Sequence, residues 1–177
     1  MKNIEKYLSL LGDEVDGLLL TSRYSRYYGA EFDIAEGVAI VTKAGCRYFT
    51  DSRYIESAQN GIQGFEVLEV NRENNYTKRL NQAIADFGVT TLGYEEEYLT
   101  VAELQSYEEK LEAKLLPYNR KISAFRIVKE DWEFQLMRKG SVFGQDKQSA
   151  TGIIPQLCLI AGLHLPTAVD TPTLATK

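Results

Sequence analysis

The sequence is poor in the residues that most metal and redox sites require. It contains one histidine, His164, and two cysteines, Cys46 and Cys158, which lie far apart. Zinc and redox sites use cysteines and histidines at short, regular spacings. His164 stands between two leucines without such a spacing, so we interpret it as a satisfied or exposed side chain. The sequence therefore predicts no metal site, and its cysteine usage favours a reduced, cytoplasmic setting.

Long apolar runs and clusters of positive charge are also absent. No stretch approaches the ~20 apolar residues of a membrane span, and the start of the sequence lacks the apolar region of a secretion signal. The net charge is −5 without any run of Lys or Arg, which argues against a nucleic-acid or anionic-membrane surface. The motifs Gly-x-Gly-x-x-Gly of nucleotide sites and Gly-x-Ser-x-Gly of serine hydrolases are missing. What remains is an ordinary globular composition, 44% hydrophobic and 25% charged, in a chain long enough for one core.

The most informative stretch is a predicted hairpin that leads into a helix, over residues 37–58. Val38–Val41 is a short apolar, β-branched run, as in a buried strand, and Gly45 can adopt the positive φ that a tight reversal needs. Cys46–Thr50 then reads as the returning strand. The period changes from two to 3.6 after Thr50, which predicts a helix.

The junction of hairpin and helix forms an Asp-x-Arg-Tyr corner. Asp51 or Ser52 is expected to cap the helix through a side-chain oxygen, and Tyr54 falls on its inner face. We expect Asp51, Ser52 and Tyr54 to form a structural corner in which Arg53 pairs with a neighbouring carboxylate. The alternative is that Arg53 faces a substrate cleft.

The rest of the chain alternates between strand and helix patterns. Further strands are expected at Val15–Leu20, Phe65–Val70, Thr91–Glu95 and Leu115–Tyr118. Helices are expected from Asn3, from Ser22 (a short helix or turn), over Leu80–Phe87 and from the capping box Thr100–Glu103, with Ile122–Val128 as an extended link. This alternation predicts an α/β fold with helices on both faces of a sheet, and the hairpin makes that sheet mixed, mostly parallel.

Three consecutive acidic residues follow one of the predicted strands. Glu95, Glu96 and Glu97 point to alternate faces of an extended chain and cannot converge on one ion without a bend. We therefore predict a solvated strand end rather than a metal or acid/base cluster.

Three segments resemble one family, in its order and at its spacing. They are the corner Phe49-Thr-Asp-x-Arg-Tyr54, the motif Arg26-Tyr-x-Gly29, and the stretch from Ile122 to Lys139. The sequence over residues 1–139 resembles the N-terminal domain of the creatinase/prolidase/aminopeptidase P metallopeptidases. The resemblance implies a creatinase/prolidase N-terminal domain over residues 1–128 and the start of a linker helix, towards a missing catalytic domain, over residues 129–139. Residues 140–177 form an atypical tail that resembles nothing in the family.

The resemblance also implies a function for the parent protein. Such an enzyme is a cytoplasmic Xaa-Pro dipeptidase or aminopeptidase P that hydrolyses proline-containing peptides. The resemblance also implies that it is a homodimer. It uses two divalent metal ions (Mn, Co or Zn), which are bound by two Asp, one His and two Glu of the catalytic domain. This chain alone is expected to have no catalytic residue, and to supply dimer contacts and one wall of the substrate cleft.

The resemblance points to a loop as the substrate-facing part. In the family, the loop after the Tyr-x-Gly segment reaches across the dimer towards the partner's active site. The acidic residues Glu31, Asp33 and Glu36 lie in this loop and could meet the free amino terminus of a substrate. With Arg53 they are the substrate-cleft candidates. A stand-alone peptide-binding or pseudo-enzyme module and a creatinase-type amidinohydrolase are the alternatives on the same fold.

Overall fold

The computed structural model describes residues 3–127, 129, 131, 133–135 and 137–138. The chain divides into two compact units, Met1–Lys129 and Glu130–Lys177. In the second unit the described residues 131, 133–135 and 137–138 are helical. That this helix leads to a catalytic domain stays a prediction. His164, Cys158 and the atypical tail lie outside the described residues.

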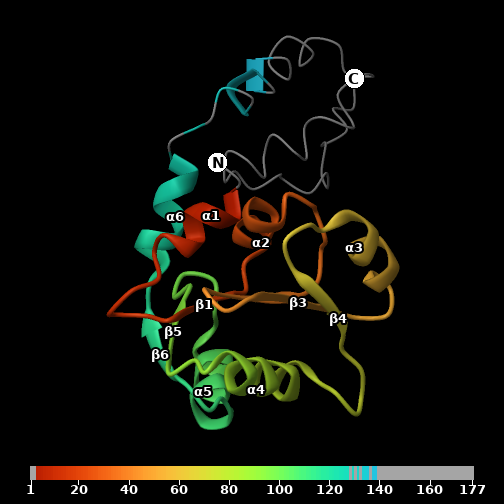
Figure 1. The fold of residues 1–177 in the computed structure, drawn as a ribbon, viewed down its shortest axis with the longest axis vertical. Coiled ribbons are helices and arrows are strands. Elements are labelled where there is room, and N and C mark those ends of the chain that lie inside the picture. Colours follow the sequence, from red (N-terminus) through yellow and green to blue (C-terminus); the bar gives the residue numbers. More distant parts are fainter. Residues whose placement is uncertain (1–2, 128, 130, 132, 136, 139–177) are drawn as a thin grey trace, which may run out of the picture. The chain divides into compact units, whose positions relative to one another are not determined.

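The first unit contains twelve elements, in which helices and strands alternate except where β3 directly follows β2 (Figure 1). Its strands are β1 (Gly17–Leu20), β2 (Val38–Thr42), β3 (Cys46–Thr50), β4 (Glu66–Glu69), β5 (Thr91–Tyr94) and β6 (Lys114–Pro117). Its helices are α1 (Asn3–Leu8), α2 (Arg23–Ala30), α3 (Ile55–Gly61), α4 (Tyr76–Phe87), α5 (Val101–Lys110) and α6 (Asn119–Ile127). In the described part of the chain, no helix has the length and apolar character that crossing a membrane requires.

The strands form one mixed sheet with the order β4-β3-β2-β1-β5-β6. β2 runs antiparallel to β1 and β3, and all other neighbouring strands are parallel. The predicted hairpin is confirmed, since Val38 faces Phe49 and Val41 faces Cys46 across the β2–β3 pair. Every strand except β2 therefore points the same way, and their carboxyl ends share one edge of the sheet.

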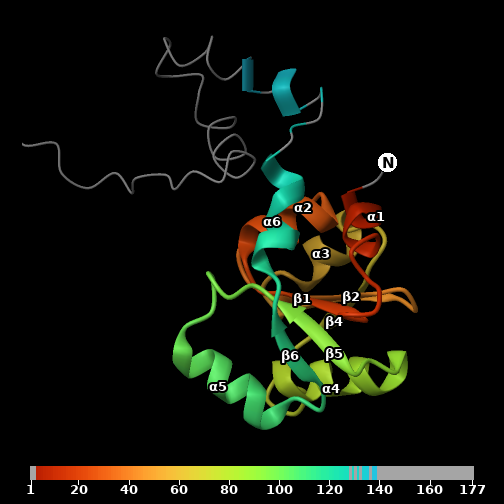
Figure 2. The same cartoon turned by 90° about the vertical axis from the view of Figure 1, so that its left-hand side faces the viewer.

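Helices cover both faces of the sheet, as the sequence predicts. Figures 1 and 2 show α1, α2, α3 and α6 on one face and α4 and α5 on the other. The central strands are buried on both faces, so successive leucines of β1 serve different cores. Leu18 packs in the cluster that contains Tyr7 and Ile122, whereas Leu19 packs in the cluster that contains Leu80.

Two local predictions are wrong. Ile122–Val128 is not an extended link, because α6 occupies Asn119–Ile127 and buries Ile122 completely. The helix after the corner begins at Ile55, with Tyr54 at the N-cap and no side-chain cap, so neither Asp51 nor Ser52 caps it. The capping box of α5 is confirmed: Thr100 and Glu103 bond each other's backbone N–H.

Candidate functional site

The candidate site lies at the carboxyl ends of β1 and β5. The chain proceeds from β1 through β2, β3 and β4 towards one edge of the sheet, and it then returns to build β5 and β6 on the other side of β1. The strand order therefore changes direction between β1 and β5. Open α/β sheets bind their ligands outside the carboxyl ends of the strands at such a point. Figure 2 shows the chain leaving β5 in a wide loop before it enters α5.

Arg26 on α2 is the buried cation of this region, with only 4% of its surface exposed. Its guanidinium donates to the Tyr48 hydroxyl at 2.6 Å and to the carbonyl oxygens of Thr21, Ile34 and Ala35. A buried guanidinium usually takes a carboxylate partner, but here neutral oxygens satisfy it. These bonds tie α2 to the loop of residues 31–37 and fix the path of that loop. The sequence identified Arg26 only as a motif match.

Glu95 corrects the prediction of a solvated strand end. It is fully buried, and its carboxylate accepts hydrogen bonds from Thr21 N, Ser22 N and Ser22 Oγ at 2.9, 2.9 and 2.7 Å. These donors precede α2, whose free N–H groups and dipole favour a negative charge. Glu96 is exposed, yet its Oε2 accepts from Asn119 N at 2.8 Å, at the start of α6.

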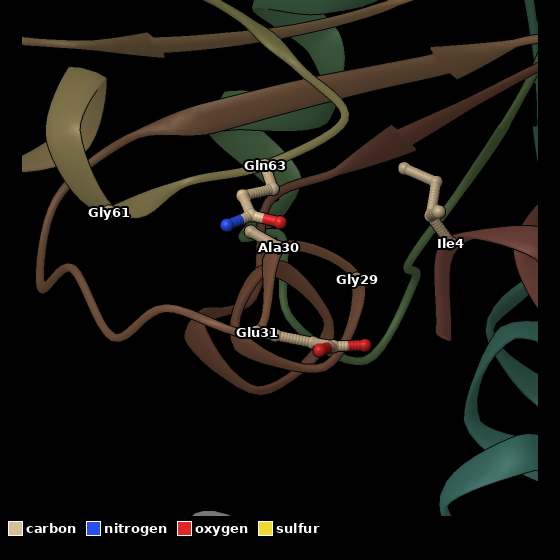
Figure 3. A pocket seen from close by; sticks show the side chains of 6 residues that line it. All are labelled: Ile4, Gly29, Ala30, Glu31, Gly61 and Gln63. Atoms are coloured by element: carbon tan, nitrogen blue, oxygen red, sulfur yellow. The ribbon is translucent and has the colours of Figure 1, made fainter. Parts of the chain in front are cut away.

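Glu31 ends α2 and lines a small hollow. It adopts the left-handed conformation, with φ 54°, and its N–H donates to Tyr27 O. Its Oε1 accepts from Asn3 N at 3.3 Å. The hollow has a volume of about 180 Å³, and Figure 3 shows the Glu31 side chain along one wall of it, with Gln63 and Ile4 on other sides.

Asp33 is held by the helix that precedes it. Two carboxylate oxygens of Asp33 accept from Arg23 Nε and Nη2 at 2.8 and 2.6 Å. This pairing raises the pKa of Arg23 above its ordinary value, against the effect of partial burial. A substrate ammonium would therefore have to compete with Arg23 for Asp33.

The structure brings Glu36 next to the Asp51–Arg53 corner. Asp51 accepts from Arg53 N at 2.9 Å, and the Arg53 guanidinium pairs with the same carboxylate at 2.5 Å. The Thr50 hydroxyl donates to Glu36 O at 3.0 Å and joins the two segments. Asp51 raises the pKa of Arg53, and the Glu36 charge adds to that effect. Glu36 and Arg53 are thus neighbours, whereas Glu31 and Asp33 make separate contacts.

A larger hollow, of about 290 Å³, lies at the point where the strand order changes direction. Thr21 after β1 and Leu99 after β5 line it, together with Gly37 and Val38 at the start of β2. Gly37 has φ 148°, and a Cβ there would lie 2.6 Å from Phe49 O, so only glycine fits. The functional groups of its wall are Arg26, Glu36, Glu103 and three tyrosines, Tyr76, Tyr98 and Tyr107.

These wall residues were only partly visible in the sequence. The spacing of α5 predicts that Tyr107 points inward, and the capping box accounts for Glu103, but neither pattern indicates a shared cavity. Tyr76 and Tyr98 lie in segments far apart in the chain, and only the strand order brings them together. Within the described residues, no group of three or more His, Cys, Asp or Glu could hold a metal ion.

Comparison with known proteins gives consistent results. The family model described as "Creatinase/Prolidase N-terminal domain" matches residues 3–128. An "Uncharacterized peptidase YqhT" of Bacillus subtilis (strain 168) is 26% identical over 145 residues, which are 81% of this chain and 40% of that protein. The chain therefore spans well under half the length of this curated relative.

Solved structures show the same fold. The structure of "Xaa-Pro dipeptidase from Bacillus anthracis" matches with a TM-score of 0.74 and 26% identity, over 82% of this chain and 42% of that one. A "Creatine_N Superfamily domain of a dipeptidase from Streptococcus thermophilus" matches with a TM-score of 0.61 and 14% identity, over 71% of this chain and 98% of that one. With a matching family model over most of its length, the chain belongs to the creatinase/prolidase N-terminal domain family.

Proposed function

We propose that this chain is the non-catalytic N-terminal domain of a cytoplasmic Xaa-Pro dipeptidase or aminopeptidase P. The observation that carries the proposal is the family match over residues 3–128. A Bacillus anthracis relative of similar fold is a Xaa-Pro dipeptidase, and its chain is more than twice as long as the matched part. The reaction then belongs to a catalytic domain with two divalent metal ions (Mn, Co or Zn), and no step of it uses a residue of this chain.

The role of this domain is to form one wall of the substrate cleft within a homodimer. Glu36 and Arg53 are the best-supported contacts, because they are neighbours and Arg53 is two-thirds exposed. Glu31 and Asp33 extend the same acidic loop, although each already has a partner. An acidic loop favours the ammonium group at the free amino terminus of a peptide, since opposite charges attract.

The cleft role is tested in the product of the whole reading frame from which this chain is translated. Glu36→Gln and Arg53→Ala should raise KM for an Xaa-Pro dipeptide several-fold, with kcat largely preserved, because these groups bind substrate without touching the reacting bond. Glu56→Gln on α3, an exposed carboxylate away from the hollow, is the matched control. Light scattering should give the mass of a dimer. An unchanged KM in both variants would remove Glu36 and Arg53 from the cleft.

A stand-alone peptide-binding module is the second candidate, because the two hollows described above have polar side chains in their walls. A reading frame that ends without a second domain, together with saturable binding of proline-containing peptides by this chain, would establish that candidate instead.

A further inference from the structure

We propose that the 290 Å³ cavity between the ends of β1 and β5 binds a small organic cation, an ammonium group carried on a compact apolar body. The cavity lies where the strand order changes direction, and its wall combines two carboxylates with three tyrosines. This site belongs to the single domain described above. It depends neither on a catalytic domain nor on the peptidase function proposed for the parent protein.

The two carboxylates of the wall are available to a ligand. Within the described part of the chain, Glu36 forms no ion pair. The nearby Arg53 pairs with Asp51 and interacts with Glu36 only through a longer-range attraction. Glu103 uses one oxygen, Oε2, to accept from Thr100 N and Thr100 Oγ1 at 2.8 and 2.7 Å. Its other oxygen, Oε1, is left for a further donor. The bonds from Thr100 lower the pKa of Glu103, so this carboxylate stays ionised at neutral pH.

Arg26 does not make the cavity an anion site. Its guanidinium is already bonded to three carbonyl oxygens and to the Tyr48 hydroxyl. These acceptors are all neutral oxygens, and they leave the guanidinium few donors for a ligand anion. The wall therefore carries one cation, Arg26, against two carboxylates, Glu36 and Glu103, and its charge is net negative.

Two tyrosines of the wall have pKa values above the ordinary value, mainly because they are buried. Burial raises the pKa of Tyr76, and the charges of Asp51 and Glu36 raise it further, although Arg26 lowers it in part. Burial raises the pKa of Tyr107, and Glu103 adds to the effect. Both phenols therefore remain neutral around neutral pH. Neutral aromatic rings beside carboxylates are the groups with which proteins bind organic ammonium ions.

The residue types in the wall favour an organic cation over a bare metal ion. Among the described residues, no group of three His, Cys, Asp or Glu could hold a metal. Phenol rings instead provide apolar area for methyl or methylene groups and a quadrupole that attracts a positive charge. Tyr98 is 39% exposed and lies at the outer part of the wall, where a ligand can reach it.

The test uses NMR titration of the whole chain, with the amides of Gly37 and Val38 as reporters. The cationic probes are choline and butylammonium. Choline is compared with the neutral analogue in which carbon replaces its nitrogen, and butylammonium with the analogue in which a hydroxyl replaces its ammonium group. Acetate is the anionic probe. We expect both cations to give saturable shifts, and the neutral isosteres to bind about tenfold more weakly because they lack the charge. Binding should weaken as salt is added.

Variants then assign the site. Glu36→Gln and Glu103→Gln should each weaken binding about three- to fivefold, and Glu103→Gln keeps the capping box because glutamine also caps. Tyr98→Phe should preserve binding, whereas Tyr98→Leu should weaken it, since only the ring is needed. Glu109→Gln, on the same helix but outside the wall, is the matched control.

Three results would overturn the proposal. One is the absence of saturable binding by either cation. Another is equal binding of a cation and its neutral isostere, or shifts caused by acetate at the same amides. The third is an affinity for the cations that is the same in Glu36→Gln and Glu103→Gln as in the control Glu109→Gln.

Discussion

The buried carboxylate of Glu95 provides the sharpest test of how the site region is built. Glu95→Ala removes the acceptor of three hydrogen bonds, from Thr21 N, Ser22 N and Ser22 Oγ. The three donors then lose their acceptor, and a buried donor left unsatisfied costs about 1–3 kcal/mol. Single hydrogen bonds to a charged acceptor contribute about 1.5–3 kcal/mol each, which is consistent with that range.

The measurement is urea unfolding at neutral pH, followed by far-UV circular dichroism. We expect the loss of these three hydrogen bonds in Glu95→Ala to lower the free energy of unfolding by about 4 kcal/mol, a large part of the 5–15 kcal/mol that a domain of this kind has. Glu95→Gln keeps one acceptor oxygen and the shape of the side chain, so it should cost about half as much and remain folded. Glu97→Ala, at an exposed carboxylate two residues further along the chain, is the control and should change stability by less than about 0.5 kcal/mol. A loss of under about 1 kcal/mol for Glu95→Ala would refute the account.

Three further predictions follow from the same contacts. Burial raises the pKa of Asp16, but hydrogen bonds from Thr90 and the next residue outweigh it and hold the pKa below its usual range. This carboxylate therefore stabilises the fold above about pH 4, and its effect is lost as the pH falls through the lowered pKa of the folded state. In urea unfolding, Asp16→Asn should reduce the stability at pH 7 and change it little near pH 2. Asp51→Ala should lower the thermal midpoint more than Arg53→Ala, because it removes both the acceptor of Arg53 N and the ion pair, and the reverse order would contradict this reading of the corner. A chain of residues 1–129 should unfold cooperatively at nearly the thermal midpoint of the whole chain, since both core clusters lie within it, and a drop of several degrees would count against a self-sufficient unit.

Patterns local in sequence predicted most of the fold. The hairpin of Val38–Thr50 and the capping box of Thr100 depend on residues close together in the chain, and both are confirmed. The mixed, mostly parallel sheet followed from the alternation of strands and helices, and it is confirmed as well. Such features need no knowledge of which strands become neighbours.

The errors arise where distant residues decide the structure. α6 looked like an extended link, but Glu96 accepts from Asn119 N at its start and Ile122 is buried in the core below it. Glu95 looked solvated because its burial depends on Ser22, in a loop 73 residues earlier in the chain. No periodicity within a short window carries that information.

The candidate site shows the same division. Sequence motifs pointed to the loop with Glu36 and to Arg53, and the structure brings these two together. They did not point to the cavity wall of Tyr76, Tyr98 and Tyr107, because its members come from different segments. A cavity between two strand ends becomes visible only once the strand order is known.

The most direct test of the central claim is hydrolysis by the product of the whole reading frame that contains this chain. The rate is measured on an Xaa-Pro dipeptide and on the matched Xaa-Ala dipeptide, with Mn²⁺, Co²⁺ or Zn²⁺ supplied, beside this chain alone under the same conditions. The account predicts metal-dependent cleavage of the Xaa-Pro bond by the whole product, a clear preference over Xaa-Ala, and no cleavage by this chain. Cleavage by this chain alone, or a folded and metal-loaded whole product without activity on Xaa-Pro, would contradict it.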